Sequence, residues 1–185
     1  MKPFRFGVQA AQLPTDSWQD AARHIESLGF STLFIPDHFS TQWDPMTALP
    51  AIAAATTTLN VGSLVYDIDY RHPVIYAKAA ATLHQMSGGR FEFGIGAGWM
   101  ETDYVEAGMK YDRPGVRISR LEEGLEVIRS MWKNERTSFK GEHYQIDNIA
   151  QATPLKDGES PKILIGGGGK RLLTLAGKVA NIVGV

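Results

Sequence analysis

An acidic residue and an imidazole stand side by side directly after an apolar stretch of this chain. The stretch is Thr32-Leu33-Phe34-Ile35-Pro36, and Asp37 and His38 follow it. Buried strands of α/β folds deliver reactive side chains from their carboxyl ends in this way. Imidazole is available both neutral and protonated near pH 7, so His38 suits proton transfer, with a structural role as the alternative. Adjacent extended residues point opposite ways, so we expect Asp37 to brace the loop instead of binding the same atom.

A glycine-rich run follows a second predicted strand, at Gly94-Ile95-Gly96-Ala97-Gly98-Trp99. It fails the dinucleotide fingerprint, because the third glycine of G-x-G-x-x-G would fall at Trp99. Positions without side chains still let a flat ring approach the backbone, which makes Gly96, Ala97 and Gly98 candidate cofactor contacts. The alternative is a tight turn within a crowded barrel interior.

A second glycine run, Gly166-Gly167-Gly168-Gly169, joins a predicted strand to a helix that begins at Lys170. Free N–H groups and the helix dipole favour an anion there. It is not a Walker loop, because Leu164 occupies the position of the first glycine and Arg171 the position of the Ser or Thr. We therefore expect a phosphate monoester or diester at this site, or else a loop that is simply flexible.

Three other residues follow predicted strands. Trp43 either walls an apolar pocket or packs in the core. Arg71 and His72 follow residues 61–66, so either side chain reaches the same face, or His72 caps the next helix. No two histidines or carboxylates have zinc-like or calcium-like spacing, and no G-x-S-x-G motif occurs. Metal and acyl-transfer chemistry are therefore not predicted.

Size and composition indicate an ordinary globular protein. The chain has 185 residues, 43% hydrophobic and 21% charged, with a formal net charge of −1. This charge gives no reason to expect nucleic acid, and no apolar run approaches the roughly 20 residues that span a membrane. Residues 1–6 lack the apolar core of a signal peptide, and the chain has no cysteine. We expect a cytoplasmic protein with neither a nucleic-acid nor a membrane partner.

Strand-like and helix-like patterns alternate along the chain. Strands are expected to begin near residues 4, 31, 61 and 90, with helices from residues 18, 45 and 73, and further strands at 162–165 and 181–185. This alternation predicts right-handed βαβ units and a parallel sheet. Residues 137–148 break the rhythm and predict an inserted hairpin. The helix before them buries a stripe that includes Leu121 and Leu125, and we assign its charges, Arg117 among them, to a solvated face.

Three stretches together resemble the bacterial luciferase-like monooxygenase superfamily, most closely its deazaflavin-dependent oxidoreductases. They are Phe34 to Phe39, Ser87 to Trp99 and Ile163 to Gly169. The resemblance spans nearly the whole chain. It implies an α/β fold, a TIM-type (β/α)8 barrel over residues 1–185, that binds coenzyme F420, or alternatively FMN, at the C-terminal ends of its strands.

The resemblance also implies roles for particular residues. In the deazaflavin-dependent sugar-phosphate dehydrogenases of that superfamily, an Asp-His pair and a nearby Trp line the site, which carries over to Asp37, His38 and Trp43. A non-prolyl cis peptide that cups the ring falls near Ser63 and Leu64.

The glycines from Gly166 to Gly169 correspond to the phosphate-binding segment of the same dehydrogenases. Those enzymes also carry a catalytic Glu where this chain has Trp99, and Glu101 is close but not aligned. A sugar phosphate is therefore not the expected substrate.

The chain is short for the implied fold. A closed barrel needs eight strands and about 250 residues, and about six strands are predicted here, so the C-terminal strands are missing. We expect a fragment, a chain that closes with a partner as a homodimer, or a truncated flavin-binding member. The leading hypothesis is F420-dependent hydride transfer to or from a small organic substrate. The alternatives are an FMN-dependent monooxygenase and a non-catalytic flavin-binding protein.

Overall fold

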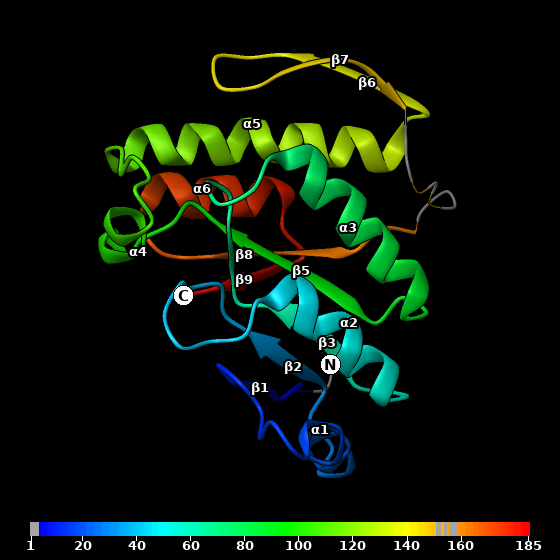
Figure 1. Cartoon of the computed structure of the whole chain (residues 1–185). Helices are drawn as coiled ribbons and strands as arrows, with labels where there is room; N and C mark the ends of the chain where they lie inside the picture. The colour runs from blue at the N-terminus through cyan, green and yellow to red at the C-terminus, as the bar shows by residue number, and fades with distance from the viewer. Residues whose placement is uncertain (1–3, 151–152, 154, 156–158) are drawn as a thin grey trace.

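Six parallel strands form a curled half-barrel in the order β1-β2-β3-β5-β8-β9, and the short strand β4 also pairs with β5. The structure is a computed structural model that describes residues 4–150, 153, 155 and 159–185. Helices lie outside the strands (Figure 1), as in other α/β barrels. The predicted α/β fold with about six parallel strands is therefore confirmed. The prediction about the first residues falls partly on residues 1–3, which lie outside the described ranges.

The elements follow the predicted alternation. The strands of the main sheet are β1 (Gly7–Gln9), β2 (Thr32–Ile35), β3 (Asn60–Ser63), β4 (Tyr66–Asp67), β5 (Phe91–Gly96), β8 (Lys162–Gly166) and β9 (Ile182–Gly184). The helices are α1 (Trp18–Ser27), α2 (Pro45–Ala55), α3 (Pro73–Met86), α4 (Glu101–Glu106), α5 (Pro114–Lys133) and α6 (Lys170–Val179). The hairpin consists of β6 (Arg136–Lys140) and β7 (Gln145–Ala150). The short helix α4 was not predicted.

Proline starts two of the helices that flank the site. In α2 it follows Asp44, whose carboxylate accepts the N–H of Thr47 at 2.9 Å. In α3 it follows His72, whose Nδ1 accepts the N–H of Val74 at 3.3 Å. Proline suits the first helical turn because its missing N–H is not needed there. His72 thus caps its helix, which was one of its two predicted roles.

The third predicted strand is interrupted in the structure. Gly62 pairs with Glu92, and Tyr66 pairs with Ile95. The segment from Gly62 to Tyr66 therefore contains one residue more than the segment of β5 that it pairs with. An extra residue of this kind makes a bulge and re-aims the side chains around it. The peptide bond between Leu64 and Val65, in the interruption, is cis. It lies one residue beyond the predicted position near Ser63 and Leu64.

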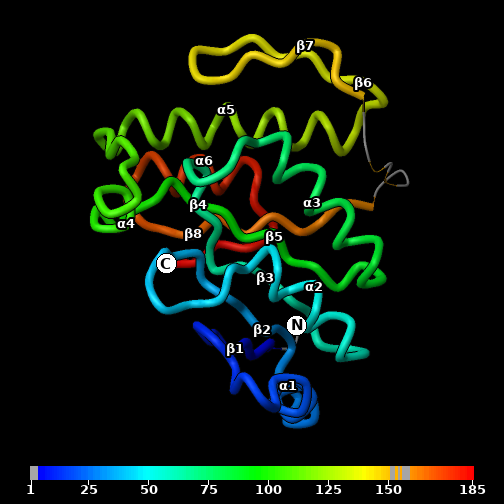
Figure 2. Tube along the Cα trace, viewed as in Figure 1, coloured from blue at the N-terminus to red at the C-terminus, as the bar shows by residue number. Residues whose placement is uncertain are grey.

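The hairpin lies along the outer side of α5 (Figure 2). Glu123 of α5 accepts the N–H groups of Glu142, His143 and Tyr144 at 2.9, 2.9 and 3.1 Å. The predicted hairpin is confirmed, and one carboxylate ties its turn to the helix.

The strands of the main sheet and the helices packed on them contribute to one apolar core. Each buried strand contributes side chains of less than a few percent exposure, such as Leu33, Val61, Phe93 and Ile165. The stripe of α5 packs on them, with Leu121 and Leu125 buried as predicted. Continuous apolar strands of this kind are expected where a parallel sheet is covered by helices. The core fixes the strand ends from which the polar residues project.

Candidate active site

A cavity of about 480 Å³ lies at the C-terminal ends of β2, β5 and β8. This volume is in the usual range of small-molecule sites. Its wall includes backbone at residues 96–98 and 166–168, together with the side chains of Leu64, Val65, Ile118 and Leu172. Polar side chains reach it from Asp37, His38, Asp67, Tyr70 and Arg117. The two predicted glycine segments and the Asp-His pair therefore meet at one pocket.

His38 is the imidazole of this pocket. Its Nδ1 lies 2.6 Å from Oδ2 of Asp103, a residue of α4 whose side chain is almost completely buried. The same Oδ2 accepts the hydroxyl of Tyr70 at 3.0 Å. The exposed ring of Trp99 stands edge-on to the His38 ring, with 5.8 Å between the centroids. The imidazole is thus held on one edge and open on the other to the pocket.

Asp37 turns to different partners from those of its neighbour. Its carboxylate accepts Nη1 of Arg71 at 2.6 Å, and Arg71 also bonds Asp44 at 2.5 Å. Burial raises the pKa of Asp37 above its ordinary value, and the Arg71 guanidinium beside it acts in the opposite direction. Asp37 and Arg71 together fasten the loop after β2 to the segment after β4. The structure thus places Asp37 where a brace was expected.

A third carboxylate, that of Asp67, borders the pocket. Its Oδ2 accepts the hydroxyl of Tyr104 at 2.7 Å. Burial raises the pKa of Asp67 and the hydrogen bond from Tyr104 lowers it, and the net result is a pKa of about 6. A Cβ added at Gly98, whose φ is +72°, would lie 2.0 Å from the Tyr104 hydroxyl oxygen. Glycine at 98 therefore makes room for this buried pair.

The other glycines divide into two kinds. A Cβ at Gly96 would come within 2.9 Å of one Val65 methyl, and a Cβ at Gly166 within 2.7 Å of the other. These two glycines let the strand ends close around Val65, so the crowded-interior alternative, which was given for the run from Gly94 to Trp99, fits Gly96. Gly168 has no atom within 4 Å of such a Cβ and faces open space.

The segment before α6 has the features of an anion seat. Gly169 is the N-cap residue, with φ +85° and no side-chain cap bond, so the first N–H groups of α6 have no acceptor within the helix. The N–H of Gly167 donates instead to the carbonyl of Gly184 at 2.9 Å, which ties β8 to β9. Among the four predicted glycines, Gly168 and Gly169 therefore have the freer backbone, although Gly169 itself does not line the cavity.

Two predicted contacts lie away from the pocket lining. The Trp43 side chain packs against the apolar core, which was the alternative prediction for it. The backbone N–H of Trp43 donates to the carbonyl of Ala11 at 3.0 Å. Ser63 is completely buried, and its hydroxyl donates to the carbonyl of Gly94 at 2.6 Å. Leu64, the next residue, does line the pocket.

The sequence reasoning missed Asp103, Tyr70 and Arg117. Asp103 contacts a residue 65 positions away, and no local pattern signals such a pair. Arg117 was wrongly assigned to the solvated face of its helix. Its guanidinium is buried, donates to the carbonyls of Ala97, Gly98 and Asp112, and stacks over a tyrosine ring.

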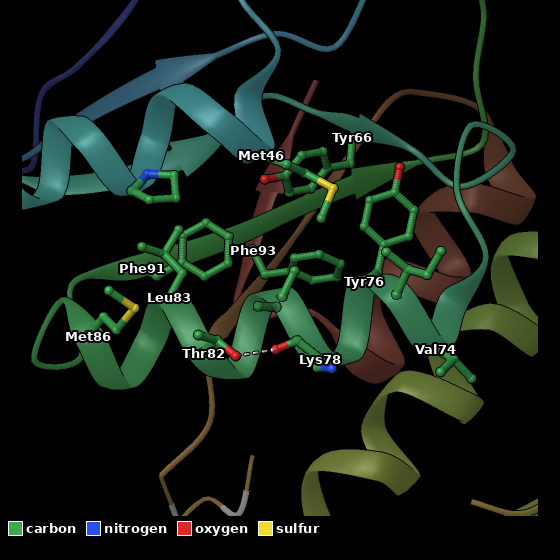
Figure 3. Close-up of a pocket in the computed structure, with 14 residues that line it drawn as sticks. Met46, Tyr66, Val74, Tyr76, Lys78, Thr82, Leu83, Met86, Phe91 and Phe93 are labelled. Carbon is green, nitrogen blue, oxygen red and sulfur yellow. Dashed lines mark hydrogen bonds between the residues drawn. The ribbon is translucent and has the colours of Figure 1, made fainter. Parts of the chain in front are cut away.

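A second cavity, of about 370 Å³, lies between α2, α3 and β5 on the outside of the sheet (Figure 3). Its lining is almost wholly apolar, with Met46, Leu83, Met86 and Phe93 among its residues. Tyr66 borders both cavities. The carboxylates and the imidazole line the first cavity, which is therefore the candidate active site.

Two further findings concern the residues that the structure describes. These residues contain no group of three or more His, Cys, Asp or Glu placed to hold a metal ion. Within the same ranges, no helix is both long and apolar enough to cross a bilayer.

A family model described as luciferase-like monooxygenase matches residues 3–185, and the chain belongs to that family. An F420-dependent glucose-6-phosphate dehydrogenase of Nakamurella multipartita is 33% identical over 191 residues, covering 97% of this chain and 55% of that protein. The F420-dependent tetrahydromethanopterin reductase of Methanopyrus kandleri superposes with a TM-score of 0.80 at 25% identity. That match covers 97% of this chain and 55% of the reductase.

A further solved structure shows the fold alone. It is an F420-dependent secondary alcohol dehydrogenase in complex with an F420-acetone adduct, with a TM-score of 0.85 at 23% identity, over 97% of this chain and 57% of that one. The chain thus spans about half the length of the relatives it matches.

Proposed function

We propose that this chain supplies the cofactor-binding and proton-handling part of an F420-dependent oxidoreductase. The observation that carries the proposal is the pocket of about 480 Å³ at the strand ends, where a backbone wall faces the His38 imidazole. The family and the F420-dependent relatives support the same reaction class. When bound, the deazaflavin supplies the carbon that accepts or gives a hydride.

The residues present fit such a cofactor. Apolar side chains of Leu64, Val65 and Leu172, together with bare backbone, suit a flat ring system. Gly168 and the N-terminus of α6 would receive a phosphate, since open space and N–H groups without helical acceptors adjoin there. Lys170, exposed at the first turn, adds a positive charge.

His38 would take the proton from a substrate hydroxyl during oxidation and return it during reduction. Asp37 and Arg117 would not act on substrate, because their polar atoms are committed to Arg71 and to backbone carbonyls. Trp99 would form an apolar wall beside His38 and exclude water from the reacting atoms. A small organic alcohol or ketone with an apolar body is thus the proposed substrate. A homodimer and a cytoplasmic location remain predictions.

Spectroscopic titration tests the proposal. The purified chain is titrated separately with F420 and with FMN, and the absorbance of each ring is followed. We expect saturable perturbation of the F420 spectrum, weaker for FMN. If neither ring binds, the proposal fails. Tight binding with no turnover on any alcohol or ketone would instead favour the non-catalytic flavin-binding hypothesis.

A further inference from the structure

Asp103 bonds two side chains that line the pocket, those of His38 and Tyr70. Its side chain is 5% exposed, and its Oδ2 is 2.6 Å from Nδ1 of His38 and 3.0 Å from the Tyr70 hydroxyl. His38 and Tyr70 both line the cavity, and they come from the ends of different strands. One buried oxygen thus joins two pocket groups that the sequence separates.

The chemistry of this contact fixes where the hydrogens lie. An ionised carboxylate only accepts hydrogen bonds, so both of its neighbours must donate. Burial and the nearby Asp67 carboxylate raise the pKa of Tyr70 well above its ordinary value, so the tyrosine keeps its proton. The hydrogen of the neutral His38 ring must then lie on Nδ1, which leaves Nε2 with a free lone pair.

We propose that Asp103 is a positioning residue, which holds His38 in the Nδ1–H tautomer and thereby makes Nε2 the atom that exchanges a proton with substrate. The proposal rests on the proposed function for the identity of the reaction. A carboxylate that orients an imidazole and fixes its tautomer is an established way of preparing a general base. The hydroxyl of Tyr70 donates to the same oxygen, so Tyr70 and His38 are both oriented by Asp103.

Asp103 differs from the other carboxylates of its helix because it is buried. Its helix, α4, carries two other carboxylates, Glu101 and Glu106, and both are exposed. Asp103 as a whole residue is 3% exposed, and within the described part of the chain its carboxylate bonds no lysine or arginine. A carboxylate in such a place is costly unless donors satisfy it, and here the donors are the two pocket side chains.

Nitrogen NMR of the imidazoles tests the tautomer without any cofactor. The chain is labelled with 15N-histidine, His38 is assigned by the signals that His38→Ala removes, and spectra are recorded near pH 8. We expect a protonated Nδ1 and a bare Nε2 in the wild type. A protonated Nε2 would overturn the proposal, and this measurement needs no variant of Asp103.

Variants test the positioning itself. Asp103→Leu replaces the carboxylate with an apolar side chain and removes the acceptor, so the His38 signals should move toward a mixture of tautomers. Glu106→Gln, which removes an exposed carboxylate of the same helix, should leave them unchanged. Unchanged signals in a folded Asp103→Leu chain would contradict the proposal, and Asp103→Asn gives a second variant if the leucine prevents folding.

Kinetics add a readout that a merely structural residue would not give. We expect Asp103→Leu to lower kcat at least about 10-fold, and by no more than the 10²- to 10⁴-fold that general acid–base catalysis contributes, with the cofactor Kd changed less than about twofold. In a His38→Ala background the same change should have little further effect, because the two residues act as a unit. Additive losses would overturn the proposal. If neither F420 nor FMN binds, the proposed function fails, and the NMR result still decides the tautomer.

Discussion

The site depends on which partner each polar side chain has. Asp37, Asp67 and Asp103 are all buried at the same strand ends, yet each carboxylate has a different donor: a guanidinium, a phenol and an imidazole, respectively. The imidazole of His38 lines the pocket and is the group to which we assign proton transfer.

Replacement of His38 tests its role directly. In His38→Ala, we expect kcat to fall by about 10²- to 10⁴-fold, the usual contribution of a general acid or base. The Kd of F420 should stay within about threefold of the wild-type value, because the ring contacts apolar side chains and backbone. Steady-state rates and a binding titration on the same preparation check both. Normal turnover at saturating cofactor would remove His38 from the chemistry.

Asp67 makes a prediction about pH. Burial raises its pKa to about 6 in the folded chain, above the ordinary 3.8, so the folded state holds this proton more tightly than the unfolded state. Its stabilising contribution is complete below about pH 4 and is lost as the pH rises through 6. Two units of pKa correspond to about 3 kcal/mol.

The measurement is the free energy of unfolding from urea titrations between pH 4 and pH 7, for the wild type and for Asp67→Asn. The wild type should lose stability relative to the variant across this range. Asp20→Asn, a change at an 81% exposed side chain, is the control and should show no such difference. Parallel curves for the wild type and Asp67→Asn would contradict the shifted pKa.

At the scale of elements, strand β5 carries the tightest backbone contact of the site. A Cβ added at Gly94 would lie 1.9 Å from the carbonyl oxygen of Ser63, which is backbone and has no room to move. Gly94→Ala should therefore destabilise the chain by about 3 kcal/mol or more, the upper range for overpacked positions.

Gly168 provides the matched control, because nothing lies within 4 Å of a Cβ added there. Gly168→Ala should unfold at the same urea concentration as the wild type, and a larger side chain, as in Gly168→Val, should weaken F420 binding without loss of stability. Chemical unfolding and the cofactor titration measure the two effects. If Gly94→Ala and Gly168→Ala were equally stable, the close contact between Gly94 of β5 and the Ser63 carbonyl of β3 would not limit the side chain at position 94.

Most elements were predictable because their signals are local. The helix starts at Asp44-Pro45 and His72-Pro73 and the hairpin after residue 136 follow from neighbouring residues. The interruption at Leu64 was not predictable, because it depends on register against β5. Neither was α4, whose six residues are too few for a clear helical period.

For the whole molecule, the sequence predicted the fold better than the site. The regular alternation of strands and helices was enough for a parallel half-barrel, and parallel strand ends bring Asp37, His38 and both glycine runs to one edge. Asp103 and Arg117 were not predictable in the same way. Their roles arise where α4 and α5 return to that edge, and such long-range contacts leave no trace in a local pattern.

The position of Trp99 gives the molecule an internal optical reporter. The chain has four tryptophans. Trp18 and Trp43 pack against the core and Trp132 is buried in it, whereas Trp99 is 69% exposed at the pocket and touches the imidazole edge-on. Indole emission depends on solvent contact, so Trp99, the tryptophan that is exposed beside His38, should contribute most of the long-wavelength fluorescence. Ligand entry can thus be followed by light from the protein itself, without a label.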